Sequence, residues 1–218
     1  MHSRKRRRKL QFLITAGGTR EYIDPVRFIS NASSGKMGYE LARAAAAAGH
    51  KVTLITGPSC LSAPAGVRIV DVETSAEMFG EVRKCFVKSD CLLMAAAVSD
   101  YTPIRAVRLK MKKSNRAITL KLKPTPDILK WAGGRKRRNQ VVIGFALEDK
   151  NLRSNAERKM RDKKMDMVVA NTPAAIGSGD CEVWVKGVSS KWRRVPRALK
   201  RTVAGRLIRM IEQLMLAD

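Results

Sequence analysis

Short apolar runs alternate with helical patterns along most of this chain, and this alternation limits its fold more than any other feature. The apolar runs predict strands at 10–16, 51–56, 67–72, 91–96, 141–145 and 167–170. The helical patterns predict helices at 35–48, 76–87, 127–132, 151–164 and 197–216. Because strands that alternate with helices form parallel sheets covered on both faces, we predict an α/β fold with a mostly parallel sheet.

Two segments depart from this alternation. Residues 182–186 alternate apolar and polar side chains and predict a late antiparallel strand at the sheet edge. Within 101–125, residues 107–113 and 117–122 also alternate, with a turn at 114–115, and predict an inserted β-hairpin. A two-stranded hairpin buries little by itself, so pairing with its copy in a second subunit is one use for it. The predicted architecture is Rossmann-like with this insertion.

Length and composition favour a globular protein. The chain of 218 residues can hold one sizeable core, and we expect a basic tail at 1–8 and a single domain at 9–218. No apolar run approaches the ~18 residues of a membrane span, and the basic start lacks a signal-peptide core, so we expect a cytoplasmic protein without membrane contact. Four cysteines without Cys-x-x-Cys spacing and only two histidines argue against a zinc site.

The formal net charge of +25 suits an enzyme with phosphorylated ligands, but it exceeds what a few phosphates require. The basic runs at 4–9 and 135–138 fit contacts with nucleic acid or another anionic surface. Solvated surface charge is the simpler interpretation. Aromatic residues make up 5% of the chain and do not interleave with the basic ones, so base stacking has little support.

The segment 14–38, between the first strand and the first helix, is the most informative stretch for function. Glycine-containing turns at 17–19 and 33–35 let backbone N–H groups approach a ligand, and the helix start adds partial positive charge, which suits a phosphate. Neither a Walker A loop nor a Gly-x-Gly-x-x-Gly fingerprint is present. At about 20 residues, the connection is far longer than the usual ~2–6, which favours a functional loop.

Several short motifs then follow one another in a recognisable order. They are TAGGTRE at 15–21, DPVRFISN at 24–31, SSGKMG at 33–38, AAAVSDY at 95–101, KMKK at 110–113, PDIL at 126–129, GFA at 144–146 with Glu148, and VAN at 169–171. In this order and spacing, over about residues 9–215, the chain resembles phosphopantothenoylcysteine synthetase, an enzyme family of coenzyme A biosynthesis.

The resemblance implies a ligase that joins 4′-phosphopantothenate and cysteine through an acyl-cytidylate, with release of pyrophosphate and CMP. It implies CTP as co-substrate, with ATP as the alternative, and Mg²⁺ as cofactor. It implies a homodimer joined through the hairpin, or flap, at 101–125. It also implies the stand-alone form or an excised synthetase domain, because no flavin-dependent decarboxylase domain precedes the motifs in this sequence.

Roles for individual residues also follow from the resemblance. Asn31 would lie at the reacting acyl group, and Lys110 would close over the site on the flap. Arg27, Asn31, Ala95 and Ala96 would bind phosphopantothenate. The implied nucleotide-binding residues are Gly17, Ser33, Gly35, Gly38, Asp100, Pro126, Phe145, Lys159 and Lys163. Asp100 can bind ribose, substrate or Mg²⁺, and no metal ligand is assigned.

The residues alone leave simpler roles open. Asn31 can satisfy its own loop backbone, Arg27 can pair with Asp24 or Glu21, and Phe145 can belong to the core. The three lysines can lie on solvated faces.

Two residues depart from the family pattern, and two other functions are considered as alternatives. Thr125 stands where the family usually has Asn, which weakens the expected nucleotide contacts, and Ala32 replaces a larger residue. A nucleic-acid-binding protein on an inactive ligase scaffold is the second hypothesis, because of the excess positive charge. An NAD(P)-dependent reductase is the third, and the missing glycine fingerprint argues against it.

Overall fold

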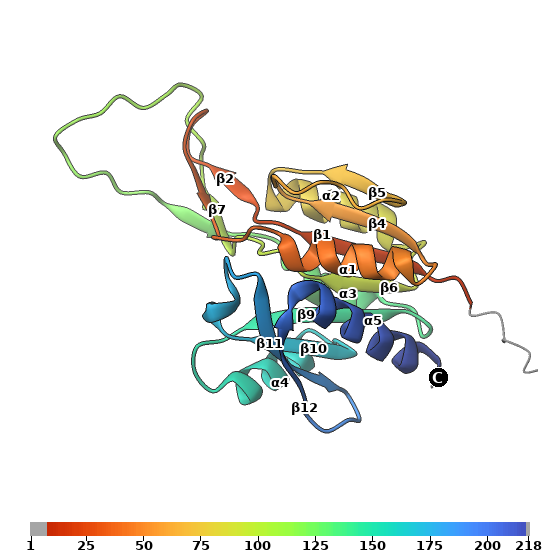
Figure 1. Cartoon of the computed structure of the whole chain (residues 1–218). Coiled ribbons are helices and arrows are strands. Elements are labelled where there is room, and N and C mark those ends of the chain that lie inside the picture. The colour runs from red at the N-terminus through yellow and green to blue at the C-terminus, as the bar shows by residue number, and fades with distance from the viewer. Residues whose placement is uncertain (1–7, 217–218) are drawn as a thin grey trace, which may run out of the picture.

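An eight-stranded sheet forms the centre of the protein in this computed structural model, which describes residues 8–216 (Figure 1). Its strands are β1 (Gln11–Ala16), β4 (Lys51–Thr56), β5 (Val67–Asp71), β6 (Cys91–Met94), β9 (Val141–Leu147), β10 (Met167–Asn171), β11 (Asp180–Gly187) and β12 (Arg193–Leu199). The sheet order is β12-β11-β10-β9-β6-β1-β4-β5. The first six of these strands in the chain pair in parallel, whereas β11 and β12 pair antiparallel.

Helices cover both faces of this sheet, as predicted. One core packs α1 (Lys36–Ala47) and α5 (Lys200–Leu216) against one face. The other core packs α2 (Ser75–Phe86), α3 (Ile128–Arg135) and α4 (Leu152–Asp162) against the opposite face. Central parallel strands such as β6 and β10 are apolar on both faces because both faces are buried, which made them easy to find in the sequence. The predicted α/β fold with a mostly parallel sheet is confirmed.

The end of the sheet differs from the prediction. Residues 182–186 do lie in an antiparallel strand, but β11 is covered by β12 and is therefore not the edge. The prediction missed β12 and started the last helix at 197 instead of 200. Residues 193–199 read RRVPRAL and lack an alternating pattern, because this outer strand is mostly exposed. Pro196 is tolerated there since edge strands have backbone groups that need no partner strand.

The long crossover between β1 and α1 contains a small hairpin that the sequence did not reveal. It consists of β2 (Arg20–Tyr22) and β3 (Phe28–Ser30). Asp24 closes its turn by accepting hydrogen bonds from the backbone N–H groups of Val26 and Arg27, each at 2.8 Å. Three-residue strands are too short for a periodic signal, so turn chemistry was the only available sign.

The insertion at 101–125 forms an arm that projects from the body of the protein (Figure 1). Its hairpin is confirmed, but the strands are β7 (Tyr101–Pro103) and β8 (Leu122–Pro124) at the base. The predicted strands at 107–113 and 117–122 are wrong, apart from Leu122, because residues 104–121 carry no regular structure. Hydrogen bonds attach the arm to the crossover, among them Val107 N–H to Ile23 O at 2.8 Å and Met111 N–H to the Asp24 carboxylate at 3.2 Å.

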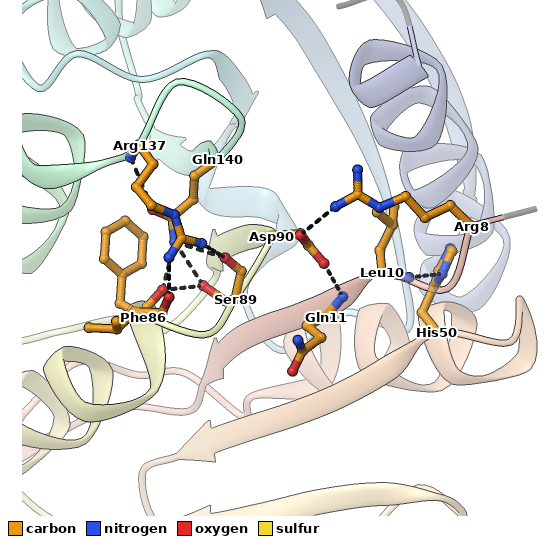
Figure 2. A network of polar contacts seen from close by, with 10 residues as sticks. Arg8, Leu10, Gln11, His50, Phe86, Ser89, Asp90, Arg137 and Gln140 are labelled. Atoms are coloured by element: carbon orange, nitrogen blue, oxygen red, sulfur yellow. Dashed lines mark hydrogen bonds and ion pairs between the residues drawn. The ribbon is translucent and has the colours of Figure 1, made fainter.

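The amino-terminal edge of the sheet is closed by a polar network (Figure 2). Asp90 accepts hydrogen bonds from the Gln11 backbone N–H at 2.8 Å and from Arg8 at 3.1 Å. The buried Gln140 amide donates to Phe86 O at 2.6 Å and to Ser89 O at 3.0 Å. These contacts hold the loops before β6 and β9.

Among residues 8–216, no helix is both long and apolar enough to cross a membrane.

Candidate active site

The candidate site lies where the order of the sheet reverses. From β1, the chain builds the sheet through β4 and β5 on one side, and through β6, β9 and β10 on the other. In open α/β sheets, ligands bind beyond the carboxyl ends of the strands at such a switch point. A cleft of about 730 Å³ opens there, lined by the crossover loop and by the segments after β6, β8, β9 and β10.

Most of the predicted site residues meet in this cleft, although they come from distant parts of the sequence. Those that line it are Asn31, Ser33, Gly35, Ala95, Ala96, Asp100, Pro126, Phe145, Lys159 and Lys163. Their convergence follows from the parallel sheet, because parallel strands end at the same edge.

The start of α1 forms one wall of the cleft. Gly35 precedes the helix with φ of 76°, a left-handed conformation that favours glycine, and a Cβ there would lie 3.1 Å from Gly17 N. The N-cap residue, a glycine, provides no side-chain cap, and the first turn holds no acidic residue, although Lys36 N–H donates to Ser34 Oγ at 3.5 Å. The Ser33 hydroxyl accepts from Gly35 N–H at 3.3 Å. The uncapped start therefore presents N–H groups and partial positive charge to the cleft.

Asn31 is held by the loop that follows β6. Its Nδ2 donates to Ala97 O and to Val98 O, each at 3.2 Å. These two carbonyl partners fix the amide orientation, because a flipped amide would place oxygen against oxygen. Oδ1 has no partner among the residues that the structure describes, so Asn31 offers an acceptor to a ligand.

Hydrogen bonds between threonines and backbone groups fix the floor of the cleft. Thr15 Oγ1 accepts from Ala96 N–H at 3.2 Å, and Thr125 Oγ1 donates to Ser99 O at 2.6 Å. Thr125 N–H also donates to Asp100 O at 2.9 Å. The Thr125 hydroxyl therefore supports the loop before Asp100, which gives this departure from the family pattern a structural role.

Lys159 of α4 and Lys163, the residue directly after α4, line the cleft with carboxylate partners. Lys163 pairs with Asp127 at 2.9 Å, and Lys159 lies 3.8 Å from Glu148. Burial opposes ionisation of Asp127, but hydrogen bonds from Lys130 N–H and from Lys163 outweigh it, so the pKa of Asp127 lies below its ordinary value. Asp127 also caps α3 through Lys130 N–H at 2.9 Å.

Two predicted phosphate-binding glycines lie outside the lining of the cleft. A Cβ on Gly38 would meet Ala16 Cβ at 2.5 Å, so this glycine lets α1 pack closely on β1. Gly17 has φ of 76°, and a Cβ there would lie 3.0 Å from Gly57 O. Both positions have packing reasons for glycine, which sequence motifs do not distinguish from ligand contacts.

Arg27 and Lys110 also lie outside the cleft lining. Arg27 pairs with Asp24 at 2.5 Å, which was the simpler role left open above, and donates to Met111 O at 3.1 Å. Lys110 is exposed on the arm.

The sequence interpretation missed several cleft residues. Lys36 and Lys200 are the first residues of α1 and α5, and both line the cleft with Ile176 and Gly177. Lys36 stands directly after a predicted ligand glycine, which was a usable signal. Lys200 follows an edge strand that was itself missed, so nothing in the sequence placed it near the other residues.

The sheet order and the cleft at its switch point define a doubly wound α/β protein of the nucleotide-binding type. The family described as DNA/pantothenate metabolism flavoprotein C-terminal domain matches residues 7–215, and the chain belongs to this family. The match confirms the resemblance drawn from the motifs.

Individual relatives agree with this assignment. The chain is 45% identical over 168 residues to the coenzyme A biosynthesis bifunctional protein CoaBC of Bacillus subtilis (strain 168), covering 77% of this chain and 41% of the relative. It is 38% identical over 203 residues to the CoaBC protein of Borreliella burgdorferi, covering 92% of this chain and 52% of that protein. The chain thus spans about half the length of these curated relatives.

Solved structures show the same fold. The crystal structure of the C-terminal domain of a CoaBC protein superposes with a TM-score of 0.82 at 35% identity, covering 96% of this chain and 97% of that one. A Cab2 mutant in complex with phosphopantothenate-cysteine superposes with a TM-score of 0.79 at 16% identity, and at this identity the likeness concerns the fold alone.

Proposed function

We propose that this chain is a ligase that forms 4′-phosphopantothenoylcysteine from 4′-phosphopantothenate and cysteine. The observation that carries the proposal is that motifs implied by the family, scattered from Asn31 to Lys163, converge on one cleft. The names of the relatives, which concern coenzyme A biosynthesis, support the same reaction.

In the first step, the carboxylate of phosphopantothenate attacks the α-phosphorus of a nucleoside triphosphate, and pyrophosphate leaves. This step needs positioning and neutralisation of charge rather than a protein nucleophile. The uncapped start of α1 and the lysines of the cleft supply positive charge. Asp100 lines the cleft and makes no ion pair among the described residues. Its carboxylate could therefore help to hold a Mg²⁺ ion that is bound mainly by the substrate phosphates. Mg²⁺ would neutralise phosphate charge there.

In the second step, the amine of cysteine attacks the acyl carbon, and CMP leaves. We infer that Asn31 Oδ1 accepts a hydrogen bond from this amine, because the Nδ2 of Asn31 is engaged by two carbonyl groups. Donation from Asn31 Nδ2 to a developing oxyanion on the acyl group would require this amide to release at least one of them.

The direct test mixes the protein with 4′-phosphopantothenate, cysteine, Mg²⁺ and either CTP or ATP in single-turnover experiments. We expect CMP, pyrophosphate and the amide in equal amounts with CTP. Omitting cysteine should give pyrophosphate and an acyl-cytidylate without the amide. If neither triphosphate yields a nucleoside monophosphate and pyrophosphate, the ligase assignment is contradicted. Faster turnover with ATP than with CTP contradicts the preference for CTP.

We propose a homodimer joined through the arm at 101–125. Exposed apolar side chains on the arm support this proposal, among them Leu109 at 79% and Ile118 at 60% exposure. Lys110 and Arg27 stay predicted site residues. Lys110 lies on the arm and Arg27 in the turn between β2 and β3, and neither lines the cleft of its own subunit, so contribution from a second subunit would bring them to a cleft. Sedimentation equilibrium should give twice the chain mass, and Ile118→Lys should give a monomer. Val188→Lys, at an exposed position away from the arm, is the matched control.

The alternatives gain no support. Most of the 4–9 basic run lies outside the described residues, whereas in the 135–138 run Lys136 pairs with Asp166 and Arg137 donates to Ser89 O. The nucleic-acid hypothesis, the reductase hypothesis and the cytoplasmic location stay predictions.

A further inference from the structure

Lys200 is a buried lysine of the cleft that the family motifs leave without a role. It is only 5% exposed, and its Nζ donates one hydrogen bond, to Ala175 O at 2.8 Å. An ammonium group carries three N–H donors. Across residues 8–216, no carboxylate forms an ion pair with it. A buried charge without a counter-charge is costly, so something must balance it when the cleft is in use.

The local environment of Lys200 increases this cost. It begins α5, where the helix dipole disfavours a cation, and the first turn of α5 holds no acidic residue. Burial, followed by the nearby charge of Lys36, lowers the pKa of Lys200, and the neighbouring Cys181 and Asp180 only partly oppose this. Asp180 is already engaged, since it accepts from Arg197 at 2.9 and 3.0 Å and from the Ser178 hydroxyl at 2.7 Å.

Lys36 is in a similar position on the neighbouring helix start. It lines the cleft, and its Nζ lies 3.7 Å from where a Cβ on Gly179 would stand. The backbone N–H of Lys200 donates to Gly179 O at 3.1 Å, so both lysines border the same loop. Within the described chain, Lys36 has no ion-pair partner either. Lys159 and Lys163 differ, because Glu148 and Asp127 accompany them.

We propose that Lys36 and Lys200 form an anion subsite that binds a phosphate or diphosphate group of the substrates. This inference rests on the proposed function and extends it, because it gives a role to Lys200, which lies outside the family motifs, and to Lys36, a motif residue to which no role was assigned above. The start of α1 adds uncapped N–H groups beside Lys36. A bound oxyanion can accept hydrogen bonds from the Lys200 donors that Ala175 leaves free and replaces the missing counter-charge.

The test measures binding of inorganic pyrophosphate to the full chain by calorimetry, without turnover. Lys200→Met and Lys36→Met should each weaken pyrophosphate affinity by about tenfold or more, since each removes a charge-assisted contact. Arg201→Met removes a neighbouring exposed cation from the same helix turn and should leave the affinity unchanged. Competition with CTP and with 4′-phosphopantothenate identifies which substrate supplies the group.

Thermal unfolding separates this role from a structural one. If Lys200 binds an anion, the melting temperature of Lys200→Met without ligand should equal or exceed that of the wild type. Pyrophosphate should raise the melting temperature of the wild type but not that of Lys200→Met. Wild-type affinity in either Lys→Met variant overturns the proposal, as does an equal loss in Arg201→Met. Where Lys200→Met lowers the melting temperature, Lys36→Met decides, because Lys36 lacks the contact to Ala175. If pyrophosphate binding is weakened in both Lys→Met variants and unchanged in Arg201→Met, but the protein shows no ligase activity, only the proposed reaction is refuted and the anion subsite stands.

Discussion

The two edges of the central sheet use polar residues in opposite ways. At the amino edge, charged and amide groups are engaged within the protein: Asp90 with Gln11 and Arg8, and Gln140 with Phe86 and Ser89 (Figure 2). At the carboxyl edge, Lys36 and Lys200 have no ion-pair partner among residues 8–216. Asn31 Oδ1 likewise accepts no hydrogen bond from any of the described residues.

This contrast indicates a division between stability and function. Hydrogen-bonded groups stabilise a fold only when both partners are present, whereas groups with free donors or acceptors are available to a ligand. Substitutions at the amino edge should therefore change the free energy of unfolding, and substitutions at the carboxyl edge should change binding and turnover.

The largest effect is expected for Asn31→Asp. The new carboxylate would face Ala97 O and Val98 O, so it should turn away from its present position. We expect the rate of amide formation to fall by about 100-fold or more, the scale for loss of one positioned polar group. The melting temperature should change little because Asn31 is exposed. Asn139→Asp, an exposed asparagine at the amino edge, is the control. A near-normal rate in Asn31→Asp would refute its role.

Gln140→Ala tests the other edge. Removing the buried amide takes hydrogen bonds from Phe86 O and Ser89 O, so the free energy of unfolding should fall by about 1–3 kcal/mol. Urea denaturation measures this change, and nucleotide affinity should stay unchanged. Gln213→Ala, at an exposed position on α5, should have little effect on either quantity. A loss of nucleotide binding without a loss of stability would contradict the division between the edges.

Lys163→Met probes a cleft lysine that already has a partner. The pKa of Asp127 should rise, because Lys163 helps to hold it below its ordinary value. We expect CTP affinity to weaken by about tenfold, as for one charge-assisted contact. Calorimetric titration of CTP measures the affinity, with Lys150→Met, which is exposed outside the cleft lining, as the control. Unchanged CTP affinity would mean that Lys163 serves only as the ion-pair partner of Asp127, the residue that caps α3.

The smallest effect concerns Asp24, which joins the arm to the crossover. Burial opposes its ionisation, but backbone N–H groups of Val26, Arg27 and Met111 and the Arg27 side chain lower its pKa from 3.8 to about 2. A lowered pKa in the folded state stabilises the protein above pH 3.8, and this contribution is lost as the pH falls through about 2.

Asp24→Asn should therefore be less stable than the wild type at pH 5, and the difference should shrink as the pH falls and vanish below about pH 2. Urea midpoints across this range measure the difference. Asp71→Asn, an exposed carboxylate, should follow the wild type throughout. A difference that persists unchanged at the acid end would show that the charge of Asp24 is not what fixes the arm.

Local patterns in the sequence were enough to predict the buried parallel strands, the covering helices and the motifs, because burial on both faces and glycine-containing turns leave such patterns. Most of the site residues predicted from the motifs do line the cleft. Only the tertiary structure separated Gly35, which lines the cleft, from Gly38, which packs against Ala16. Only it brought Lys200 to Lys36, because their proximity depends on α1 and α5 packing side by side, and local patterns carry no information on such distant contacts.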